Sequence, residues 1–491
     1  MLRTIIRQEF LAHLMSARFF AAVIITLLLV VANAVVLLED YERRSDRYNH
    51  QKNVHREKAQ EAKTYSFLKL YVERPPNPLS LFSSGLDKRL GGTLEIYHGS
   101  VPMISNTSAR SLDNPFLNLF SKIDLVFIFQ VVLSLIALLF AYDAIAGDRE
   151  AGTLRLVVSH PVRRGSILLA KYMSAMICLL LPVLMSLLMI MFLLSMSGSI
   201  QLSGQDFVRI GGVVLTTSIY LSVFYLIGLL ISTMTRRTAT SLMLCMFVWV
   251  VLVLVYPNWS RFSIDPVDDM QAERTSTEEH VSQIWEEVDR EEQRFIANSP
   301  LEEDPPWFNL SYHEQGRSYG DGRQMLTSKV KAESEHLVPH VQEYHETMEA
   351  LRIRLAEQTA LIRKQSLDKT TFREARWHEH LMKLSPSGLY TFAASAWVGT
   401  DLDGMFDYVD AAQQYRRSII DYFHEKNAFG SRQWFDTSKG EVDWWDLPQF
   451  RFERVDVWEN ASRAFPELVL LLLINTVLFT VAFLLFVRIE V

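Results

Sequence analysis

Six long apolar runs dominate the pattern of hydrophobic and polar residues along this chain. Each run approaches or exceeds the about 20 apolar residues that a helix needs to cross a hydrocarbon core about 30 Å thick. None shows the two-residue alternation of a membrane β-barrel strand. The pattern therefore predicts an all-α polytopic membrane protein with transmembrane helices at residues 19–38, 123–142, 167–196, 210–232, 240–256 and 468–487. A cleaved signal peptide is the alternative for the first run, but no small-x-small cleavage site follows it.

Positive charge is concentrated beside one set of span ends. The short segments on that side carry Arg3, Arg7, Arg18, Arg149, Arg155, Arg163, Arg164, Lys171, Arg236, Arg237 and Arg488. The short loop on the other side, residues 197–208, contains no Lys or Arg. Because Lys and Arg stay on the cytoplasmic side of a membrane, both termini are expected in the cytoplasm. The two long segments, 39–122 and 257–467, are then expected outside it.

The larger external segment has the composition of a folded helical domain. Nine of the ten Trp residues lie in it, whereas both cysteines, Cys178 and Cys245, fall inside predicted spans, so no disulfide is available outside. Apolar residues recur at heptad spacing in two stretches, and we expect these to pair as an antiparallel helical stalk. They are Val281, Ile284, Val288 and Phe295, and Leu337, Val341, Tyr344, Met348, Leu351, Leu355 and Ile362. Fourteen acidic residues against four Arg between Asn258 and Trp307 make nucleic acid an unsuitable partner.

The N-terminus carries an amphipathic pattern. Leu2, Ile6, Phe10 and Leu14 recur every fourth residue, and charged or polar residues occupy the other face. Residues 1–18 are therefore predicted to form an interfacial helix on the inner leaflet. A simple extension of the first span is the alternative.

The cytoplasmic connector between the second and third spans, residues 143–166, contains "GDREAGTLRLVVSHPVRRG". Gly147 and Gly152 permit sharp bends, Thr153 is suited to cap a short following helix, and Pro161 limits that helix. Its apolar residues Leu154, Leu156 and Val157 are flanked by charges, which suits docking into a cleft of a soluble partner. An ordinary polar turn is the alternative.

Here the sequence resembles a known family. Glu150, Gly152, Thr153 and Leu154 match the E-x-G-T-L pattern after the second helix of type-2 ABC exporter permeases, and Ser159, Pro161 and Arg163 match its S-x-P-x-R continuation. "NPLSLFSSGLD" and "LSPSGLYTFAASAWVGTD" look like segments of a subgroup with a large external domain before the last span, similar to permeases of multicopper-enzyme maturation. The family's elbow helix corresponds to residues 1–18.

The resemblance implies a coupling element that contacts an ATPase subunit. The residues expected to make that contact are Asp148, Arg149, Glu150, Gly152, Thr153, Leu154, Arg155, Val157, His160, Pro161 and Arg163. The chain lacks a G-x-x-x-x-G-K-[ST] phosphate loop, so ATP and Mg are expected on a separate cytoplasmic ABC ATPase, present in two copies. A second permease chain, identical or related, would complete the usual twelve-span core in a bacterial inner membrane, and an external protein or lipoprotein is a further possible partner.

No catalytic site is predicted. Nothing pairs a nucleophile with a base at a recognisable spacing, and no cofactor is expected on this chain. His336, His340, His378 and His380 are weak metal candidates, for which solvated histidines on a charged helix are the alternative. The span centres hold Asn33, Gln130 and Asn475 but no ionisable residue, which favours an apolar or amphiphilic substrate, or force transmission, over ion coupling. A membrane-anchored receptor or scaffold remains the alternative function.

Overall fold

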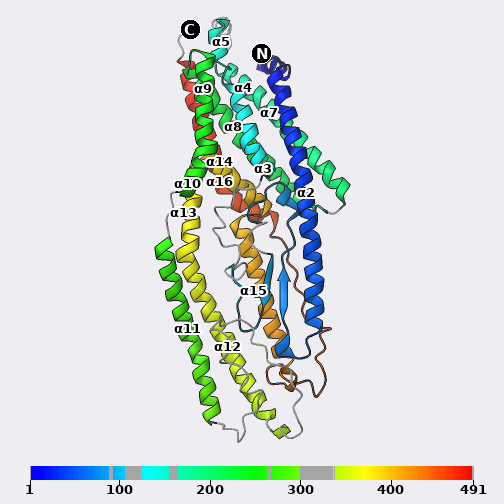
Figure 1. Cartoon of the computed structure of the whole chain (residues 1–491). Helices are drawn as coiled ribbons and strands as arrows, with labels where there is room; N and C mark the ends of the chain where they lie inside the picture. The colour runs from blue at the N-terminus through cyan, green and yellow to red at the C-terminus, as the bar shows by residue number, and fades with distance from the viewer. Residues whose placement is uncertain are drawn as a thin grey trace.

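The computed structural model describes residues 2–87, 92–104, 123–153, 164–198, 200–262, 267–298, 335–336 and 338–488. The described chain is mainly helical, with one two-stranded sheet. The molecule is elongated, and both termini lie at one end together with α5 (Figure 1). The long helices α11 and α12 reach toward the opposite end.

Six helices among the described residues are long and apolar enough to cross a membrane. They span Ala17–Gln60, Leu125–Glu150, Arg164–Ser197, Gly204–Met234, Thr238–Trp259 and Val457–Val487. Every predicted apolar run lies within one of them except for Ile123 and Asp124 at the start of the second, and most of these helices extend beyond their run because flanking polar residues continue the same helix. The longest extension belongs to the first span, whose helix α2 continues as a charged, solvated segment to Gln60.

Helix α1 (Leu2–Leu14) precedes the first span. The spans are built from α2 (Ala17–Gln60), α3 (Leu125–Ile128), η4 (Phe129–Leu133), α4 (Ser134–Ala141), α5 (Ala146–Glu150), α7 (Arg164–Ser197), α8 (Gly204–Met234), α9 (Thr238–Trp249), η5 (Val250–Val255), α10 (Tyr256–Phe262) and α16 (Val457–Val487). Helix α1 packs along α7.

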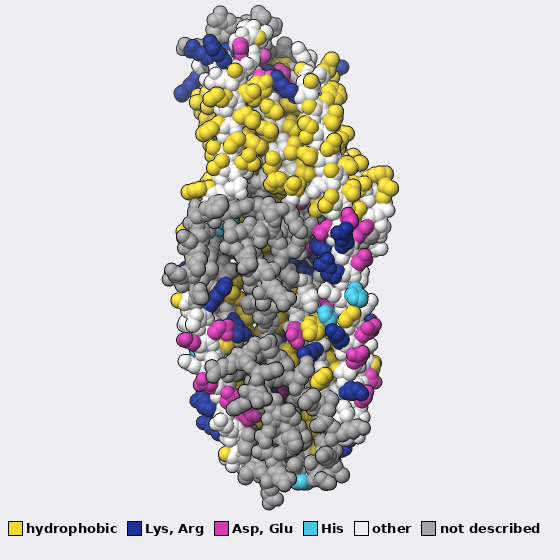
Figure 2. Space-filling model, in the orientation of Figure 1, with side chains coloured by type: hydrophobic (Ala, Val, Ile, Leu, Met, Phe, Trp, Pro, Cys, Tyr) yellow, Lys and Arg dark blue, Asp and Glu magenta, His cyan; other side chains and the backbone are white. Residues whose placement is uncertain are grey.

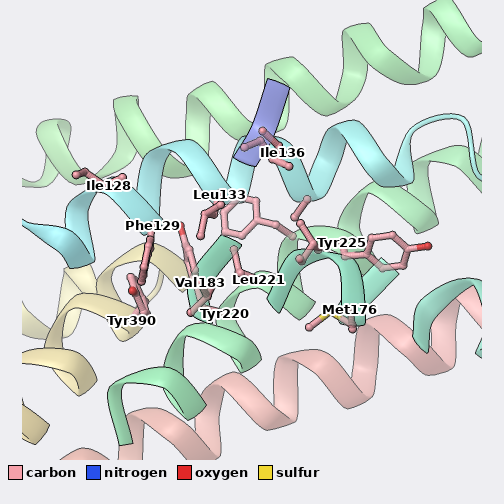
Figure 3. Close-up of a cluster of buried hydrophobic side chains, with 14 of the residues drawn as sticks. Ile128, Phe129, Leu133, Ile136, Met176, Val183, Tyr220, Leu221, Tyr225 and Tyr390 are labelled. Atoms are coloured by element: carbon pink, nitrogen blue, oxygen red, sulfur yellow. The ribbon is translucent and has the colours of Figure 1, made fainter. Parts of the chain in front are cut away.

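The surface and the interior of the span region are both apolar. Figure 2 shows a continuous hydrophobic band around the end that carries the spans, with charged side chains beyond it on both sides. Leu28, Leu188 and Leu473 are among its exposed members. Such a band is the surface that lipid covers in a membrane protein. Inside it, Leu133, Val183 and Leu221 are fully buried in one cluster (Figure 3).

The second and fifth spans are each interrupted by a π-helical turn, η4 and η5. A π-turn frees backbone carbonyls, which must find other donors inside a membrane. The carbonyl of Gln130 accepts from the Tyr220 hydroxyl at 2.9 Å. The carbonyl of Leu252 accepts from Ser385 Oγ at 3.0 Å and from Ser387 Oγ at 2.9 Å. A backbone carbonyl of each π-helical turn therefore accepts a hydrogen bond from a side chain of another element.

Helix α14 (Pro386–Val398) is a short apolar helix packed against α8 and α16. Ser385 caps its start by accepting from the Ser387 amide. The Tyr390 ring stacks on Tyr220 of α8, and Thr391 Oγ1 donates to Gln130 Oε1 at 3.2 Å. The segment that follows the external helices thus returns to contact the spans before α15 begins.

The external part has its own core. Strands β1 (Leu70–Glu73) and β2 (Thr93–Ile96) pair antiparallel, with Leu70 opposite Ile96. They pack with α15 (Leu402–Glu425) around buried aromatic residues that include Trp434 and Trp444. The 3-10 turns η1 (Tyr65–Phe67) and η8 (Arg432–Trp434) belong to this core, whereas Leu79 and Leu81 of a third turn, η2 (Pro78–Leu81), pack in the core of the spans. Buried aromatic side chains, and not disulfides, stabilise this region, because both cysteines are free and buried in α7 and α9.

Two long external helices run side by side in opposite directions. They are α11 (Val267–Asn298) and α12 (Val338–Leu367), which continues through η7 (Asp368–Phe372) into α13 (Arg373–Met382). Val281 and Val288 of α11 are buried against Leu355 of α12. Ion pairs Arg363–Glu278 and Arg354–Glu287 join their exposed edges at 3.0 and 3.3 Å.

The two histidine pairs considered as metal ligands lie far apart. His340 is at the start of α12, where its ring lies against Phe295, whereas His378 and His380 belong to α13. Thirty-eight residues of nearly continuous helix separate His340 from His378, which is about 55 Å at 1.5 Å per residue. Within the described ranges, no group of three or more His, Cys, Asp or Glu side chains is arranged to hold a metal ion.

Candidate functional site

The candidate site is the end of the second span and the start of the connector that follows it. Helix α5 (Ala146–Glu150) lies there beside the N-terminal helix, the first turns of α7 and the link between α8 and α9 (Figure 1). Basic side chains gather at the same end of the molecule in Figure 2.

The start of α5 is fixed by one serine of α8. Ser232 Oγ accepts hydrogen bonds from the amides of Ile145 and Ala146, at 3.0 and 2.9 Å. The first amides of a helix have no partner within the helix, and Ser232 supplies one from a neighbouring span. Ser232 is fully buried, so this contact fixes the second span against the fourth.

Arg149 and Glu150 bind the link between the fourth and fifth spans. Arg149 Nη1 donates to the Thr235 carbonyl at 2.7 Å. Glu150 Oε2 accepts from the Thr238 amide at 2.9 Å and from its hydroxyl at 2.8 Å. Thr238 is the first residue of α9, so the carboxylate caps that helix and complements its N-terminal dipole.

Asp148 belongs to a cluster of three charged residues on the other side of α5. Lys171 of α7 places its Nζ 3.0 Å from Asp148 Oδ2 and 2.9 Å from Glu9 Oε1 of α1. The Lys171 side chain is only 12% exposed, so the pairing is shielded from solvent. One lysine thus joins the N-terminal helix, the third span and the connector.

A second ion pair joins the first span to the end of the second. Arg18 Nη1 lies 2.6 Å from Asp143 Oδ2, and its guanidinium lies 4.9 Å from the centre of the Tyr142 ring. At the far end of the connector, Arg164 Nη1 donates to the Val487 carbonyl at 2.6 Å. The connector is therefore anchored to the first and last spans as well.

The two connector glycines behave differently. Gly152 has a φ of +73°, the left-handed conformation that glycine adopts without strain, and it marks the bend expected there. Gly147 lies inside α5 and makes no such bend. Thr153 Oγ1 donates to the Asp148 carbonyl at 3.2 Å, and the helix it was expected to cap lies outside the described residues.

The predicted contact residues divide into two sets. Asp148, Arg149, Glu150, Gly152 and Thr153 are described and lie together on and after α5. The others lie outside the described residues, and they are Leu154, Arg155, Val157, His160, Pro161 and Arg163. The structure thus places the described acids and Arg149 in contacts with neighbouring spans.

Sequence reasoning missed several residues that hold this end together. Asp143 directly precedes α5 in the sequence. Glu9 comes from α1, and Ser232, Thr235 and Thr238 come from one stretch around the link between α8 and α9, so only the fold brings these two segments to α5. One available signal was the polar cluster "STMTRRTATS" in the short link between the fourth and fifth spans. That link lies on the same side of the membrane as the connector.

The arrangement allows the connector and the spans to move together. Through α5, the start of the connector is bonded to α1, α7, α8 and the first turn of α9.

Membrane helices in this arrangement, with a connector fixed to its neighbouring spans, define a polytopic permease. The chain belongs to the ABC-2 family of transporter proteins, which residues 3–491 match.

Two curated relatives share parts of the sequence. The chain is 31% identical over 125 residues to the probable ABC transporter permease protein NosY of Stutzerimonas stutzeri, covering 26% of this chain and 45% of that protein. It is 51% identical over 43 residues to the protein of the same name from Pseudomonas aeruginosa, covering 9% of this chain and 16% of that one. The alignments thus span less than half the length of either relative.

Proposed function

We propose that this protein is the transmembrane subunit of an ATP-driven assembly in which separate ABC ATPase subunits, in two copies, dock on residues 143–166. ATP and Mg are held by those subunits. The chain lies in a bacterial inner membrane with both termini in the cytoplasm and the domain that contains β1, β2, α12 and α15 outside. A second permease chain, identical or related, completes the membrane core.

The observation that carries this proposal is the bonding of α5 to several spans at once. Glu150 caps α9, Arg149 binds the end of α8, and Asp148 shares Lys171 with Glu9. A docked partner that moves the connector would displace these helices together. The basic side chains at this end support the cytoplasmic assignment, because Lys and Arg near span ends mark that side.

A contiguous path leads from the connector to the external domain. The second span continues from α5 to Gln130, whose carbonyl and side-chain oxygens accept from Tyr220 and Thr391. Tyr390 of α14 stacks on Tyr220, and α14 leads directly into α15. We propose that displacement of the connector reaches the external domain by this path.

The polar side chains within the spans join helices to one another. Asn475 Nδ2 donates to the Ile219 carbonyl at 3.1 Å, and the Tyr172 hydroxyl lies 2.7 Å from Ser222 Oγ. These contacts fit a body that transmits force to an external partner, such as a protein or lipoprotein. They are also compatible with export of an apolar or amphiphilic substrate, which needs no ionisable residue in the spans.

The test is ATP hydrolysis by an ABC ATPase that co-purifies with this protein, measured with the full chain in nanodiscs. We expect such an ATPase to be recovered after mild solubilisation, and we expect the permease to change the hydrolysis rate. Glu150→Arg should abolish that change because it removes the cap on α9 and reverses the charge. Glu57→Arg is the matched control, since Glu57 is exposed on the external part of α2.

The alternative is a membrane-anchored receptor or scaffold whose external domain binds a partner without ATP. It is favoured if no ATPase co-purifies and hydrolysis is the same with and without the chain. If Glu150→Arg and Glu57→Arg have equal effects on hydrolysis, the ATPase is still a partner but does not contact the connector.

A further inference from the structure

A cavity of about 260 Å³ lies where the external domain meets the outer ends of the spans. One water occupies about 30 Å³ in the liquid, so this space holds a larger ligand. The second span contributes Asp124 and Gln130 to its wall, and α14 contributes Thr391 and Ser395. The cavity thus lies at the end of the second span that is remote from α5.

The wall of the cavity is largely aromatic and aliphatic. The apolar side chains include Leu86, Phe127, Phe372, Phe392, Leu402 and Phe406. Phe372 and Phe406 face each other, with ring centres 5.0 Å apart and planes at 59°. An alkyl chain or a methylated head group fits against such a surface, and aromatic faces also attract cations.

The charged groups of the wall are mostly acidic. Asp124, Glu379, Asp401 and Asp403 face one arginine, Arg376, and one histidine, His378. Most of these acids are already satisfied. Glu379 lies 2.6 Å from Lys383, and Asp124 accepts from the amides of Ser84 and Phe127.

Asp403 is the acid that lacks a close cation. In the part of the chain that is described, it makes no hydrogen bond or ion pair within bonding distance, because Arg463 pairs with its neighbour Asp407 at 2.8 Å. Asp403 lines the cavity but stays exposed to solvent in the first turn of α15, and Asp401 beside it is half-buried. Partial burial raises the pKa of Asp403 and raises the pKa of Asp401 to about 6, and Arg463 partly opposes the shift in both. A cation in the cavity would favour the charged form of both carboxylates.

We propose that this cavity binds the ammonium head of an amphiphile at the outer membrane surface. The Asp403 carboxylate contacts the ammonium group, and Phe406, one helical turn further along α15, lies with Phe372 beside its methylene or methyl groups. A bare metal ion is a poorer fit, because the described residues offer no group of three or more ligands suited to a metal. The site is independent of ATPase docking and holds whether the protein transports or transmits force.

The probe is an alkyltrimethylammonium that carries a diazirine on its chain, photolysed with the full chain in phosphatidylglycerol nanodiscs, whose headgroup carries no ammonium. Cross-linked peptides are identified by mass spectrometry. We expect saturable labelling of the peptides that contain Phe372 and Phe406. Unlabelled alkyltrimethylammonium should displace the probe, and an alkyl sulfate of equal length should not.

Three variants on α15 make the test specific. Asp403→Asn should weaken labelling about fivefold, the size expected for one carboxylate–cation contact near the surface. Asp410→Asn, exposed on the same helix outside the cavity, should leave it unchanged. Phe406→Leu should also weaken labelling, and thermal unfolding confirms that each variant is folded.

Equal labelling of the wild type and Asp403→Asn, or equal displacement by the alkyl sulfate, would overturn the proposal. A second arm identifies the source of the ammonium. If phosphatidylethanolamine in the nanodisc competes with the probe, the natural ligand is a lipid headgroup. If it does not, the site takes a free or protein-linked amphiphile.

Discussion

The rings of Tyr220 and Tyr390 stack with their centres 4.3 Å apart and their planes at 14°. Tyr220 belongs to the fourth span and Tyr390 to α14, so this pair joins the membrane core to the segment that leads into the external domain. Both side chains are fully buried. Each hydroxyl has a partner, since Tyr220 donates to the Gln130 carbonyl and Tyr390 lies 3.0 Å from Thr217 Oγ1.

Two substitutions at Tyr390 should distinguish the contribution of its ring to stability from that of its hydroxyl. Tyr390→Phe keeps the stack and removes one hydrogen bond, so we expect a loss of about 1 kcal/mol in the free energy of unfolding. Tyr390→Ala removes the ring and leaves a cavity, which should cost about 3–5 kcal/mol. Thermal unfolding in detergent measures both. Equal effects of the two substitutions would show that the ring contact contributes little.

Two adjacent glycines of α8 provide a matched pair. A Cβ on Gly212 would lie 2.2 Å from the Trp397 ring of α14, whereas a Cβ on Gly211 would meet no atom within 4 Å. Gly212→Ala should therefore displace α14 at a cost of about 1–3 kcal/mol. Gly211→Ala should be neutral or stabilise the helix by up to about 1 kcal/mol. The melting temperatures of the two variants check this, and a Gly212→Ala protein as stable as the wild type would contradict the close packing.

The spans could be predicted from sequence because lipid imposes a local rule. Each crossing needs about 20 apolar residues in succession, and six of the described helices satisfy that rule. Helix α14 could not be placed in this way. Its 13 residues are apolar but too short to span, and its position depends on Tyr220, Gln130 and Leu252, which are distant in the sequence.

The candidate site was only partly predictable for the same reason. The bend at Gly152 follows from a local preference of glycine, and the structure has it. The contacts that hold α5 join residues far apart, such as Arg149 and Thr235, which are 86 positions apart. A single sequence does not pair such residues. Glu150 was expected to contact a partner ATPase, which stays a prediction, and the sequence did not indicate the bond that its carboxylate makes to Thr238.

The left-handed backbone at Gly152 should matter for coupling more than for insertion. Gly152→Asn places a residue that tolerates this conformation, whereas Gly152→Val places a β-branched residue that does not. No atom lies within 4 Å of a Cβ at this position, so the difference is one of backbone strain alone. We expect the valine variant to insert normally but to lose most of its effect on ATP hydrolysis. The asparagine variant should keep most of that effect, and equal hydrolysis rates would contradict the prediction.

The buried His345 should make the external domain sensitive to acid. Its ring stacks on Phe435 at 5.6 Å, and neither ring nitrogen has a hydrogen-bond partner among the described residues. Burial lowers the pKa of His345 to about 3; Glu349 opposes this shift, while Arg352 and His98 add to it. The unfolded chain binds a proton at this histidine near pH 6.5, whereas the folded chain does not until about pH 3. Stability is therefore lost as the pH falls from about 6.5 toward 3.

Glu349 acts in the same direction at lower pH. Burial alone would raise the pKa of Glu349, but Arg352 and His98 hold it below its ordinary value, so its contribution is lost only as the pH falls below about 4.5. Between pH 7 and pH 5 Asp401, whose raised pKa is about 6, also titrates, so the difference between the wild type and His345→Phe isolates the histidine. Over that interval His345 should cost about 2 kcal/mol of stability. Thermal unfolding of His345→Phe should show a correspondingly smaller loss, while His380→Gln, which changes an exposed histidine of α13, should keep the wild-type response. Parallel pH profiles for the wild type and His345→Phe would mean that His345 is protonated in the folded protein and that its surroundings accommodate the charge.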